Sequence, residues 1–489
     1  MTISFNEIPV DLRVPGVYIE FDNSRALSGL PGQPHKILVI GQRLAGTPVA
    51  AEVPTLITSA AQAEVAWGRG SMIAAMFRAL KAANPRTESW GLALDDDVAG
   101  VTAAGQLAVT GPATAAGTVS LYVAGTRVRA AVADADTATV VAAAIVAAIN
   151  ADTTLPVTAA VNGVDDFKAD LTARHKGEGG NAIDLRLNYR QGEALPAGIA
   201  IAITPLAAGA TNPDVADAIA AIGDTQYHTL VMPWTDDANL DALELELTAR
   251  WGPLVMKEGH AFAAVRGTHG ALITFGAARN SPFLTVMGEG AAPEAPWVWA
   301  AAVAGIDAAE PDPARPRQTL LLPGLLPAAE ADAFTAVERE LLLGSGIATA
   351  FVAPGGTVHV ERLITTYQLN TQGIPDPSYL DVTTLRTLAY LRFSTRQRFA
   401  LKFPRHKLAD DGTQFSPGQA VATPSSLRLE YLALFRDWEF AGLVEGFEQF
   451  KDDLLVERDA GDPNRVNAQL PPDLINQLRV QATQIQFRL

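Results

Sequence analysis

Short apolar runs that favour buried strands alternate along the sequence with longer stretches whose apolar residues recur at helical spacing. Strands are predicted for residues 37–40 and 227–233 and for the runs ESWGLALDD, HAFAAVRG and SPFLTVMG. Helices are predicted for residues 71–83 and for DDANLDALELELTARWG, which should end near Gly252. Because strands that alternate with helices are typical of an α/β layer, this pattern predicts an α/β core.

A segment of different texture, residues 98–205, interrupts the alternation and is rich in Ala, Thr and Val. GTVSLYVAGTRVRAAVA predicts a hairpin that turns at Ala124 and Gly125, and DTATVVAAAIVAAINAD predicts a helix. FKADLTARHKGEGGNAIDLRLNY predicts a second hairpin that turns in GEGGN. The sequence therefore predicts an independent, β-rich α+β domain inserted between two halves of the core.

The chain changes again from about residue 351. A long helix is predicted in PSYLDVTTLRTLAYLRFSTRQRFALKF, with Asp381 as its N-cap. Residues 385–407 carry seven basic side chains and no acid, whereas EYLALFRDWEFAGLVEGFEQFKDDLLVERDAGD, further on, carries ten acids. The basic stretch has three interpretations, namely a solvated helix face, a face that docks on an acidic partner or neighbouring subunit, and a nucleic-acid surface. Docking is favoured because the rest of the chain has the opposite charge.

Each end of the chain predicts a strand that has no turn and second strand beside it. In VPGVYIEFDN the apolar and polar side chains alternate, and they alternate again at the end of VQATQIQFRL, where the period slips near Thr483. A lone strand presents unpaired N–H and C=O groups, so both segments are expected to add to a sheet of another chain. The predicted arm residues are Val17, Tyr18, Ile19, Glu20, Phe21, Val480, Ile485, Gln486, Phe487 and Leu489.

The predicted fold class is therefore multidomain, with both α/β and α+β parts. The predicted segments are an N-terminal extended arm at 1–28, the first half of a discontinuous α/β core at 29–97, the inserted domain at 98–205, the second half of the core at 206–350, an α+β C-terminal domain at 351–477, and a C-terminal strand arm at 478–489.

The net charge of −16, from 37 basic and 53 acidic residues, argues against a general nucleic-acid binder and against binding to an anionic membrane surface. The absence of cysteine excludes disulfides, thiolate metal sites and a cysteine nucleophile. The start MTISFNEIPVDLR lacks the features of a signal peptide, and no run of 18 apolar residues occurs. We therefore expect a chain made in a cytoplasm and not exported by its own sequence.

Patterns that resemble nucleotide or nucleophile sites lack the residues that such sites require. Gly41 and Gly46 follow a strand, but Thr47 and Pro48 stand where a phosphate loop needs Lys and Ser or Thr. In LGSGI, Leu343 occupies the first glycine position of a nucleophile elbow. Neither pattern predicts catalysis.

Patterns that resemble metal sites are equally incomplete. The acids at 95–97 are better interpreted as a solvated linker. The seven histidines form no H-x-x-x-H or H-E-x-x-H motif, and a zinc site at His260 or His269 would need distant ligands. The sequence thus predicts no enzyme, cofactor or metal.

Several strings, taken in order, nevertheless match one family. The strings are VPGVYIEFDNSRA, LTARHKGEGGNAIDLRLNY, AGATNPDVADAIAAIGD, RNSPFLTVMG, TTYQLNTQGIPDPSYLDVTTLRTLAYLRF, FPRHKLADDGTQF and INQLRVQATQIQFRL. On these strings, which run nearly from end to end, the chain resembles the contractile-tail sheath proteins of Mu-like bacteriophages.

The resemblance implies a virion protein, assembled in the host bacterial cytoplasm, whose subunits stack as six-membered rings around an inner tail tube. It implies arms that complete sheets across subunits, a C-terminal domain facing the tube, an inserted domain outside, and contraction that drives the tube through the cell envelope. Implied partners are other copies, the tube protein, and baseplate and terminator proteins, without direct nucleic-acid contact, membrane insertion, cofactor or catalysis. Candidate tube- or neighbour-facing basic residues are Arg386, Arg392, Arg396, Arg398 and Lys402.

Three alternatives remain open. The chain could be another tail component, such as a terminator or a baseplate-proximal sheath homologue. It could be the sheath of a phage-derived contractile injection particle. An α/β enzyme with a lid-like insertion is the third alternative, and the incomplete motifs weigh against it.

Overall fold

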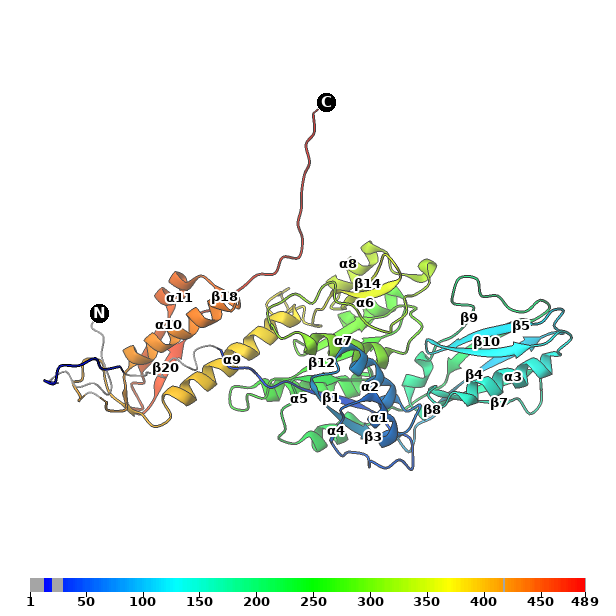
Figure 1. The fold of residues 1–489 in the computed structure, drawn as a ribbon, viewed down its shortest axis with the longest axis horizontal. Coiled ribbons are helices and arrows are strands. Elements are labelled where there is room, and N and C mark those ends of the chain that lie inside the picture. The colour runs from blue at the N-terminus through cyan, green and yellow to red at the C-terminus, as the bar shows by residue number, and fades with distance from the viewer. Residues whose placement is uncertain (1–12, 20–29, 417, 489) are drawn as a thin grey trace. The chain divides into compact units, whose positions relative to one another are not determined.

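The computed structural model describes residues 13–19, 30–416 and 418–488, which form a mixed α/β, multi-sheet fold (Figure 1). The chain divides into two compact units. The core unit comprises residues 34–387 and 477–489, and the second unit comprises residues 1–33 and 388–476. The boundary falls inside helix α9 (Val382–Lys402), so the long helix predicted in this region exists.

A six-stranded sheet forms the centre of the core unit. Its order is β13 (Leu284–Gly288), β12 (His260–Val265), β11 (Thr229–Val231), β1 (Lys36–Gln42), β3 (Glu88–Leu94) and β2 (Thr55–Leu56). The first five strands are mutually parallel and β2 is antiparallel, so the predicted α/β alternation is confirmed. Strand β11 is shorter than the predicted 227–233, because Pro233 has no N–H to continue the ladder.

Helices cover both faces of this sheet, and the alternation of side chains along β1 shows why. Ile37 and Val39 face a cluster that contains α1, α2 and α7, whereas Leu38 and Ile40 face one that contains α4, α5 and α6. The helices on the two faces are α1 (Ala60–Trp67), α2 (Met72–Ala83), α4 (Val215–Ile222), α5 (Asp237–Trp251), α6 (His269–Ala277) and α7 (Pro296–Ala309). The core unit also contains α8 (Ala336–Gly344).

Local signals place several of these helix ends where the sequence predicts them. The Ser71 hydroxyl caps α2 by accepting a hydrogen bond from the Ala74 N–H, and Gly252 ends α5. Helix α7 is apolar on nearly all sides and is almost wholly buried. Gly305 lets it approach α2 closely, since a Cβ there would lie 2.9 Å from the Cβ of Ala83.

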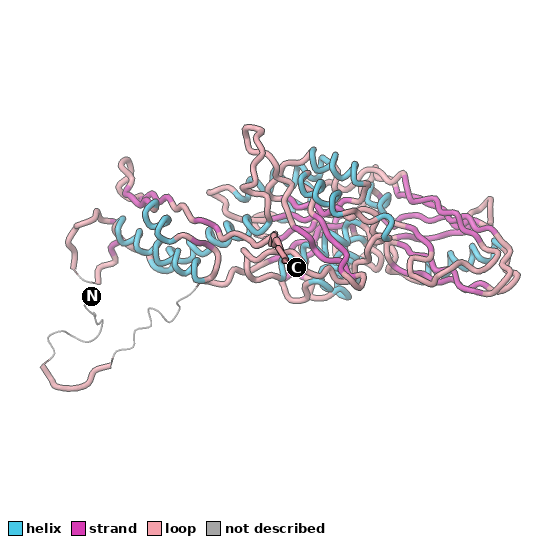
Figure 2. The backbone as a smooth tube through the Cα atoms, turned by 90° about the horizontal axis from the view of Figure 1, so that it is seen from above, coloured by secondary structure: helices cyan, strands magenta, loops and turns pink. Residues whose placement is uncertain are grey.

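The inserted region belongs to the core unit and is built mostly from strands, as Figure 2 shows by type of element. Its two sheets have the orders β10-β4-β8-β7 and β6-β5-β9, with α3 (Ala138–Ala151) beside them. The strands are β4 (Thr102–Thr110), β5 (Gly117–Val123), β6 (Thr126–Val132), β7 (Val157–Val161), β8 (Lys168–Lys176), β9 (Leu185–Leu187) and β10 (Ala200–Ala207). The boundaries at 97/98 and 205/206 remain a prediction.

One predicted hairpin of this region is confirmed and the other is wrong. Strands β5 and β6 pair around Ala124 and Gly125, both of which have positive φ, as a tight hairpin turn requires. In contrast, β8 pairs with β4 and β7, whereas β9 pairs with β5 in the other sheet. The GEGGN segment forms a short 3-10 helix (Glu178–Ala182) because Gly180 is buried against Ala103 and Ala173 instead of turning the chain back.

Two further strands, β14 (Thr349–Ala353) and β15 (Thr357–Arg362), form an antiparallel hairpin that also lies in the core unit. The compact core therefore extends past residue 351, where the predicted C-terminal domain begins. None of the helices in the described part of the chain has the length and apolarity that crossing a membrane requires.

The second unit combines most of α9 with α10 (Pro424–Phe440), α11 (Phe447–Asp453) and three two-stranded sheets. Thr423 and Ser426 form a capping box at the start of α10. The sheets pair β16 (Lys407–Leu408) with β17 (Val421–Ala422), β18 (Val444–Glu445) with β21 (Asp473–Leu474), and β19 (Leu455–Arg458) with β20 (Val466–Gln469).

Candidate assembly surfaces

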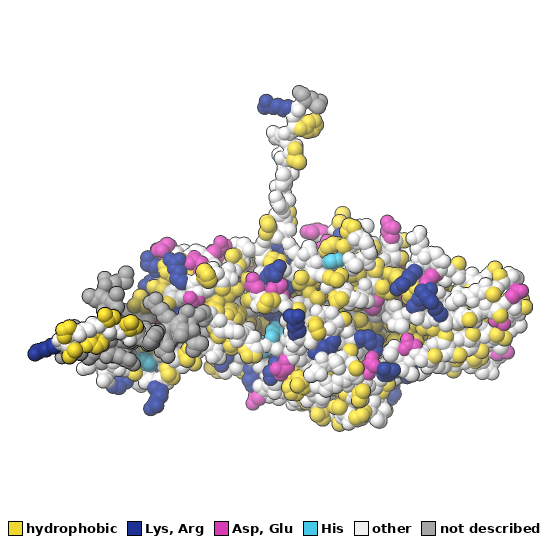
Figure 3. All heavy atoms as spheres, in the orientation of Figure 1, with side chains coloured by type: hydrophobic (Ala, Val, Ile, Leu, Met, Phe, Trp, Pro, Cys, Tyr) yellow, Lys and Arg dark blue, Asp and Glu magenta, His cyan; other side chains and the backbone are white. Residues whose placement is uncertain are grey.

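The C-terminal arm, residues 480–489, is extended and exposed over its described part (Figure 1). Figure 3 shows apolar side chains along it. Val480, Ile485 and Phe487 are 81%, 84% and 79% exposed. Gln486 lies between two of them, so apolar and polar side chains alternate as in a half-buried strand. Residue 489, the predicted Leu489 of this arm, lies outside the described residues.

The base of this arm, in contrast, is firmly held. The Gln477 amide donates to the Ala314 carbonyl at 3.0 Å, and the Leu478 carbonyl accepts from Gln318 at 3.2 Å. Arg479 forms an ion pair with Asp381 at 2.7 Å. Asp381 directly precedes α9, as predicted, but its carboxylate binds Arg479 and Arg362. The chain is thus anchored up to residue 479, and residues 480–488 beyond it are exposed.

The predicted N-terminal arm is described only at 13–19. Val17 and Ile19 are 91% and 77% exposed, and Tyr18 donates a hydrogen bond to the Val14 carbonyl. Glu20 and Phe21 lie outside the described residues. Neither described arm segment is a strand within the single chain, which is expected of segments whose partner would be another chain.

The second unit contains sheet edges that could receive such strands. Within residues 388–476, leaving out 417, each of the three sheets has only two strands, so every strand has one edge unpaired in its sheet. Leu455 on β19 is 60% exposed. An isolated two-stranded sheet is marginally stable in water, so a third strand would stabilise it.

The basic residues of α9 lie in different environments. Arg398 binds Glu430 and also Asp437, the latter at 2.6 Å, and Lys402 binds Glu430 at 2.8 Å. These pairs join α9 to α10 within the second unit. Arg396 is exposed and forms no ion pair with any described residue, and Arg392 is half-buried.

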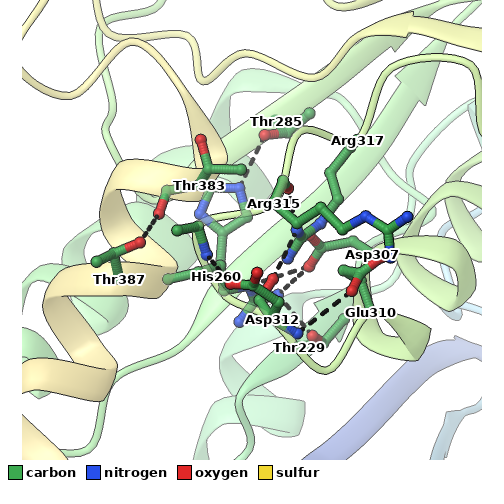
Figure 4. A network of polar contacts seen from close by, with 12 residues as sticks. Thr229, His260, Thr285, Asp307, Glu310, Asp312, Arg315, Arg317, Thr383 and Thr387 are labelled. Atoms are coloured by element: carbon green, nitrogen blue, oxygen red, sulfur yellow. Dashed lines mark hydrogen bonds and ion pairs between the residues drawn. The ribbon is translucent and has the colours of Figure 1, made fainter. Parts of the chain in front are cut away.

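Arg386 contributes to a buried ion cluster instead of a surface. Figure 4 shows Asp307 and Arg317 of this cluster. The side chain of Asp307, on α7, is fully buried and binds Arg386 at 2.6 Å and Arg317 at 3.0 Å. Arg386 also donates to the His228 carbonyl at 2.6 Å and to the Thr229 hydroxyl at 2.7 Å. The cluster therefore fixes the first turns of α9 against the central sheet.

The electrostatics of this cluster follow from burial and the two cations. Burial alone would raise the pKa of Asp307, but the guanidinium groups of Arg386 and Arg317 hold it well below its usual range. Burial, and then the charge of Arg386, lowers the pKa of His260 to about 3, and its ring binds the Thr285 hydroxyl. His260 is thus a neutral core histidine, as predicted. Asp307 was not among the predicted site residues, although a lone acid in the apolar run WVWAAAVAGIDAA was a usable signal.

One constellation resembles a catalytic triad but is structural. His175 binds Asp96 at 2.9 Å, but its other ring nitrogen already accepts from the Met72 N–H at 3.1 Å. The Ser71 hydroxyl caps α2. Asp96 also accepts from Gln42, so this acid is not part of a purely solvated linker. Among the described residues, no three His, Asp or Glu side chains are placed to hold a metal ion.

Comparison with known proteins gives consistent matches over the chain. A model of the phage tail sheath protein central domain matches residues 208–366, and a model of the phage tail sheath C-terminal domain matches residues 375–488. The tail sheath protein of the Mu-like prophage FluMu of Haemophilus influenzae is 46% identical over 491 residues, which cover 100% of both chains.

Solved structures match more distantly. The sheath tail protein of Desulfitobacterium hafniense has a TM-score of 0.49 and 13% identity, over 94% of this chain and 100% of that one. The helical sheath of the anti-feeding prophage in its contracted state has a TM-score of 0.48 and 12% identity, over 97% of this chain and 99% of that one.

Proposed function

The chain belongs to the phage tail sheath family, and we propose that its subunits polymerise as stacked hexameric rings around an inner tail tube, joined by strand exchange. It is a structural tail sheath subunit of a phage or phage-like contractile system and not an enzyme. The observation that carries the proposal is the C-terminal arm, which is anchored through Arg479 and exposes alternating apolar side chains beyond it.

Strand exchange supplies a link that is both strong and tolerant of movement. Backbone hydrogen bonds give such a link its strength, and the alternation of Ile485, Gln486 and Phe487 defines which face turns inward. The exposed edges of the two-stranded sheets in the second unit are the acceptors we propose. Loops near the arms would let linked subunits move against one another without separating.

Contraction requires two lattice states of different free energy, and we propose that the subunits themselves store this difference. In the extended state they would make fewer or weaker contacts than in the contracted state, and a baseplate signal would release the transition. The tube would then be driven through the host cell envelope. The partners we propose are neighbouring copies, the tube protein, and baseplate and terminator proteins, in a virion tail assembled in the host cytoplasm.

Electron microscopy of the purified protein tests the proposal. We expect hollow, striated cylinders with sixfold rings. Particles that stop at one ring would favour a terminator instead. Cylinders recovered from lysates without capsids would favour the sheath of an injection particle. A protein that stays monomeric under every condition, with or without tube protein, would contradict polymerisation.

Arg396 and Arg398, two residues apart on α9, provide a matched test of the basic stretch. Arg398→Ala leaves Asp437 partly buried without its cation and leaves Glu430 with Lys402 alone, so we expect the free energy of unfolding of the second unit to fall by about 1–3 kcal/mol. Arg396→Ala removes an exposed side chain and should change stability by less than about 0.5 kcal/mol. If α9 docks on the tube or a neighbour, Arg396→Ala should still reduce assembly, most strongly at low salt.

Denaturant unfolding and sedimentation measure the two effects separately. Normal, salt-independent assembly of the Arg396→Ala variant would remove Arg396 from the contact surface.

A further inference from the structure

Two buried acids lie in the loop 289–295, which joins β13 to α7. Glu289 and Glu294 are each only 6% exposed. Among the described residues, both carboxyl oxygens of Glu289 and Oε2 of Glu294 are buried without a hydrogen-bond partner. Only Oε1 of Glu294 has one, because it accepts from the Leu326 N–H at 3.0 Å. Burial without partners disfavours an ionised carboxylate far more than a neutral carboxylic acid.

This loop lies where the inserted region contacts the central part of the core unit, and we call this contact the seam. A Cβ added at Gly125, in the turn between β5 and β6, would lie 2.7 Å from Oε1 of Glu294. Arg186, on β9, donates to the Ala291 carbonyl at 2.9 Å. A cavity of about 230 Å³ borders both Glu294 and the turn at 124–126, so packing at this part of the seam is loose. A second cavity, of about 240 Å³, borders Glu289 from the side of β14 and β15.

The cations around the seam are already engaged with other acids. Arg186 and Arg266 both bind Asp184, the second at 2.7 Å, and Arg339 binds Glu361 at 2.8 Å. Near the two cavities, Arg78 also pairs with Glu64, Arg127 with Glu193 and His175 with Asp96, and the titratable Tyr189 donates to the Pro327 carbonyl. None of these cations forms an ion pair with Glu289 or Glu294 within the described part of the chain.

Burial raises the pKa of Glu289 well above its usual range, against the opposing charge of Arg266, and it raises the pKa of Glu294 to about 7. A carboxyl group whose pKa is higher in the folded than in the unfolded state binds more protons when folded. Its stabilising contribution is complete below about pH 4.5, the unfolded value, and is lost as the pH rises through the folded value.

We propose that the loop 289–295 is a proton-held latch, in which Glu289 and Glu294 are neutral acids while the seam is closed and loss of their protons loosens the inserted region from the central sheet. Deprotonation places two negative charges beside Asp184 without a free cation to balance them. The seam then opens, and water reaches the carboxylates. The latch is a property of the single subunit and does not depend on polymerisation.

Infrared spectroscopy and hydrogen exchange of the full-length chain, kept below its polymerisation concentration, test the latch. We expect the band of a protonated carboxylic acid at pH 6.5 and its loss on raising the pH to 9. From pH 4.5 upward, the protection of amides at 124–126 and 185–187, corrected for intrinsic exchange, should fall by up to about tenfold per pH unit for each proton that opening releases, and the part due to Glu294 should level off above about pH 7. The measurements use a Glu244→Gln background, because burial raises the pKa of Glu244 to about 7 and this acid would add a band of its own. In that background both changes should be smaller when Glu294→Gln is added and absent when Glu289→Gln and Glu294→Gln are both added.

The control is Glu448→Gln, which removes an exposed acid paired with Lys451 in the second unit and should leave both readouts as in the parent chain. The infrared band of the Glu244→Gln chain, in which Glu289 and Glu294 are unaltered, decides protonation even if a further variant does not fold. Absence of that band at pH 6.5 would overturn the proposal. So would seam protection that stays constant from pH 4.5 to 9.

Discussion

Deleting residues 480–489 is expected to give a folded subunit that forms no cylinders. The deletion keeps the anchor contacts of Gln477 and Arg479 and removes residues whose described part is exposed, so the free energy of unfolding should change by less than about 0.5 kcal/mol. If the arm adds to a sheet of a neighbouring copy, the deletion removes at each link a series of backbone hydrogen bonds worth about 1 kcal/mol apiece, together with the burial of Ile485 and Phe487. Repeated at every subunit, this loss should abolish polymerisation.

Circular dichroism and thermal unfolding would check the fold, and electron microscopy with sedimentation would check assembly. Phe487→Ala and Gln486→Ala form a matched pair, because alternation places the two side chains on opposite faces of the strand. We expect the first substitution to weaken assembly strongly and the second to have little effect. Cylinders of normal length from the truncated chain would refute strand exchange through this arm.

The sequence predicts the core well because its signals are local. Helix α2 begins after Ser71 and α5 ends at Gly252, since a capping hydroxyl and a glycine act within one turn of the helix. The first hairpin is equally local, as Ala124 and Gly125 supply the required positive φ. That arm residues 485–487 form a strand stays a prediction, because in the single chain they are exposed and are not part of a sheet.

Pairings set by distant residues were harder to predict. The GEGGN segment has the composition of a turn, but burial of Gly180 against Ala103 and Ala173 sends β8 and β9 into different sheets. The basic stretch of α9 has the composition of a docking surface, but the acids that balance Arg398 lie more than thirty residues away, on α10. Charge counted along the chain does not tell which cations are neutralised in space.

Replacing Asp307 by alanine is expected to be the most destabilising single substitution considered, because it leaves Arg317 and Arg386 buried without their carboxylate (Figure 4). Breaking a buried ion pair from one side costs about 3–5 kcal/mol, since the remaining charges are desolvated and unbalanced. Calorimetry and urea unfolding of the core unit measure this loss. The matched control is Glu88→Gln, in the exposed pair with Lys36, where we expect less than about 1 kcal/mol.

The triple variant Asp307→Leu, Arg317→Met, Arg386→Met separates the two origins of this loss. If unpaired buried charge is the cause, removing all three charges should recover most of the stability that Asp307→Ala loses, because a well-packed apolar replacement of a buried ion cluster is often neutral. If the cluster instead stabilises the core by net attraction, the triple variant should be no more stable than the single one. The first outcome would also indicate that the cluster fixes the register of α9 against the central sheet and does not add stability. Arg386, near the start of α9, donates to the His228 carbonyl and to the Thr229 hydroxyl.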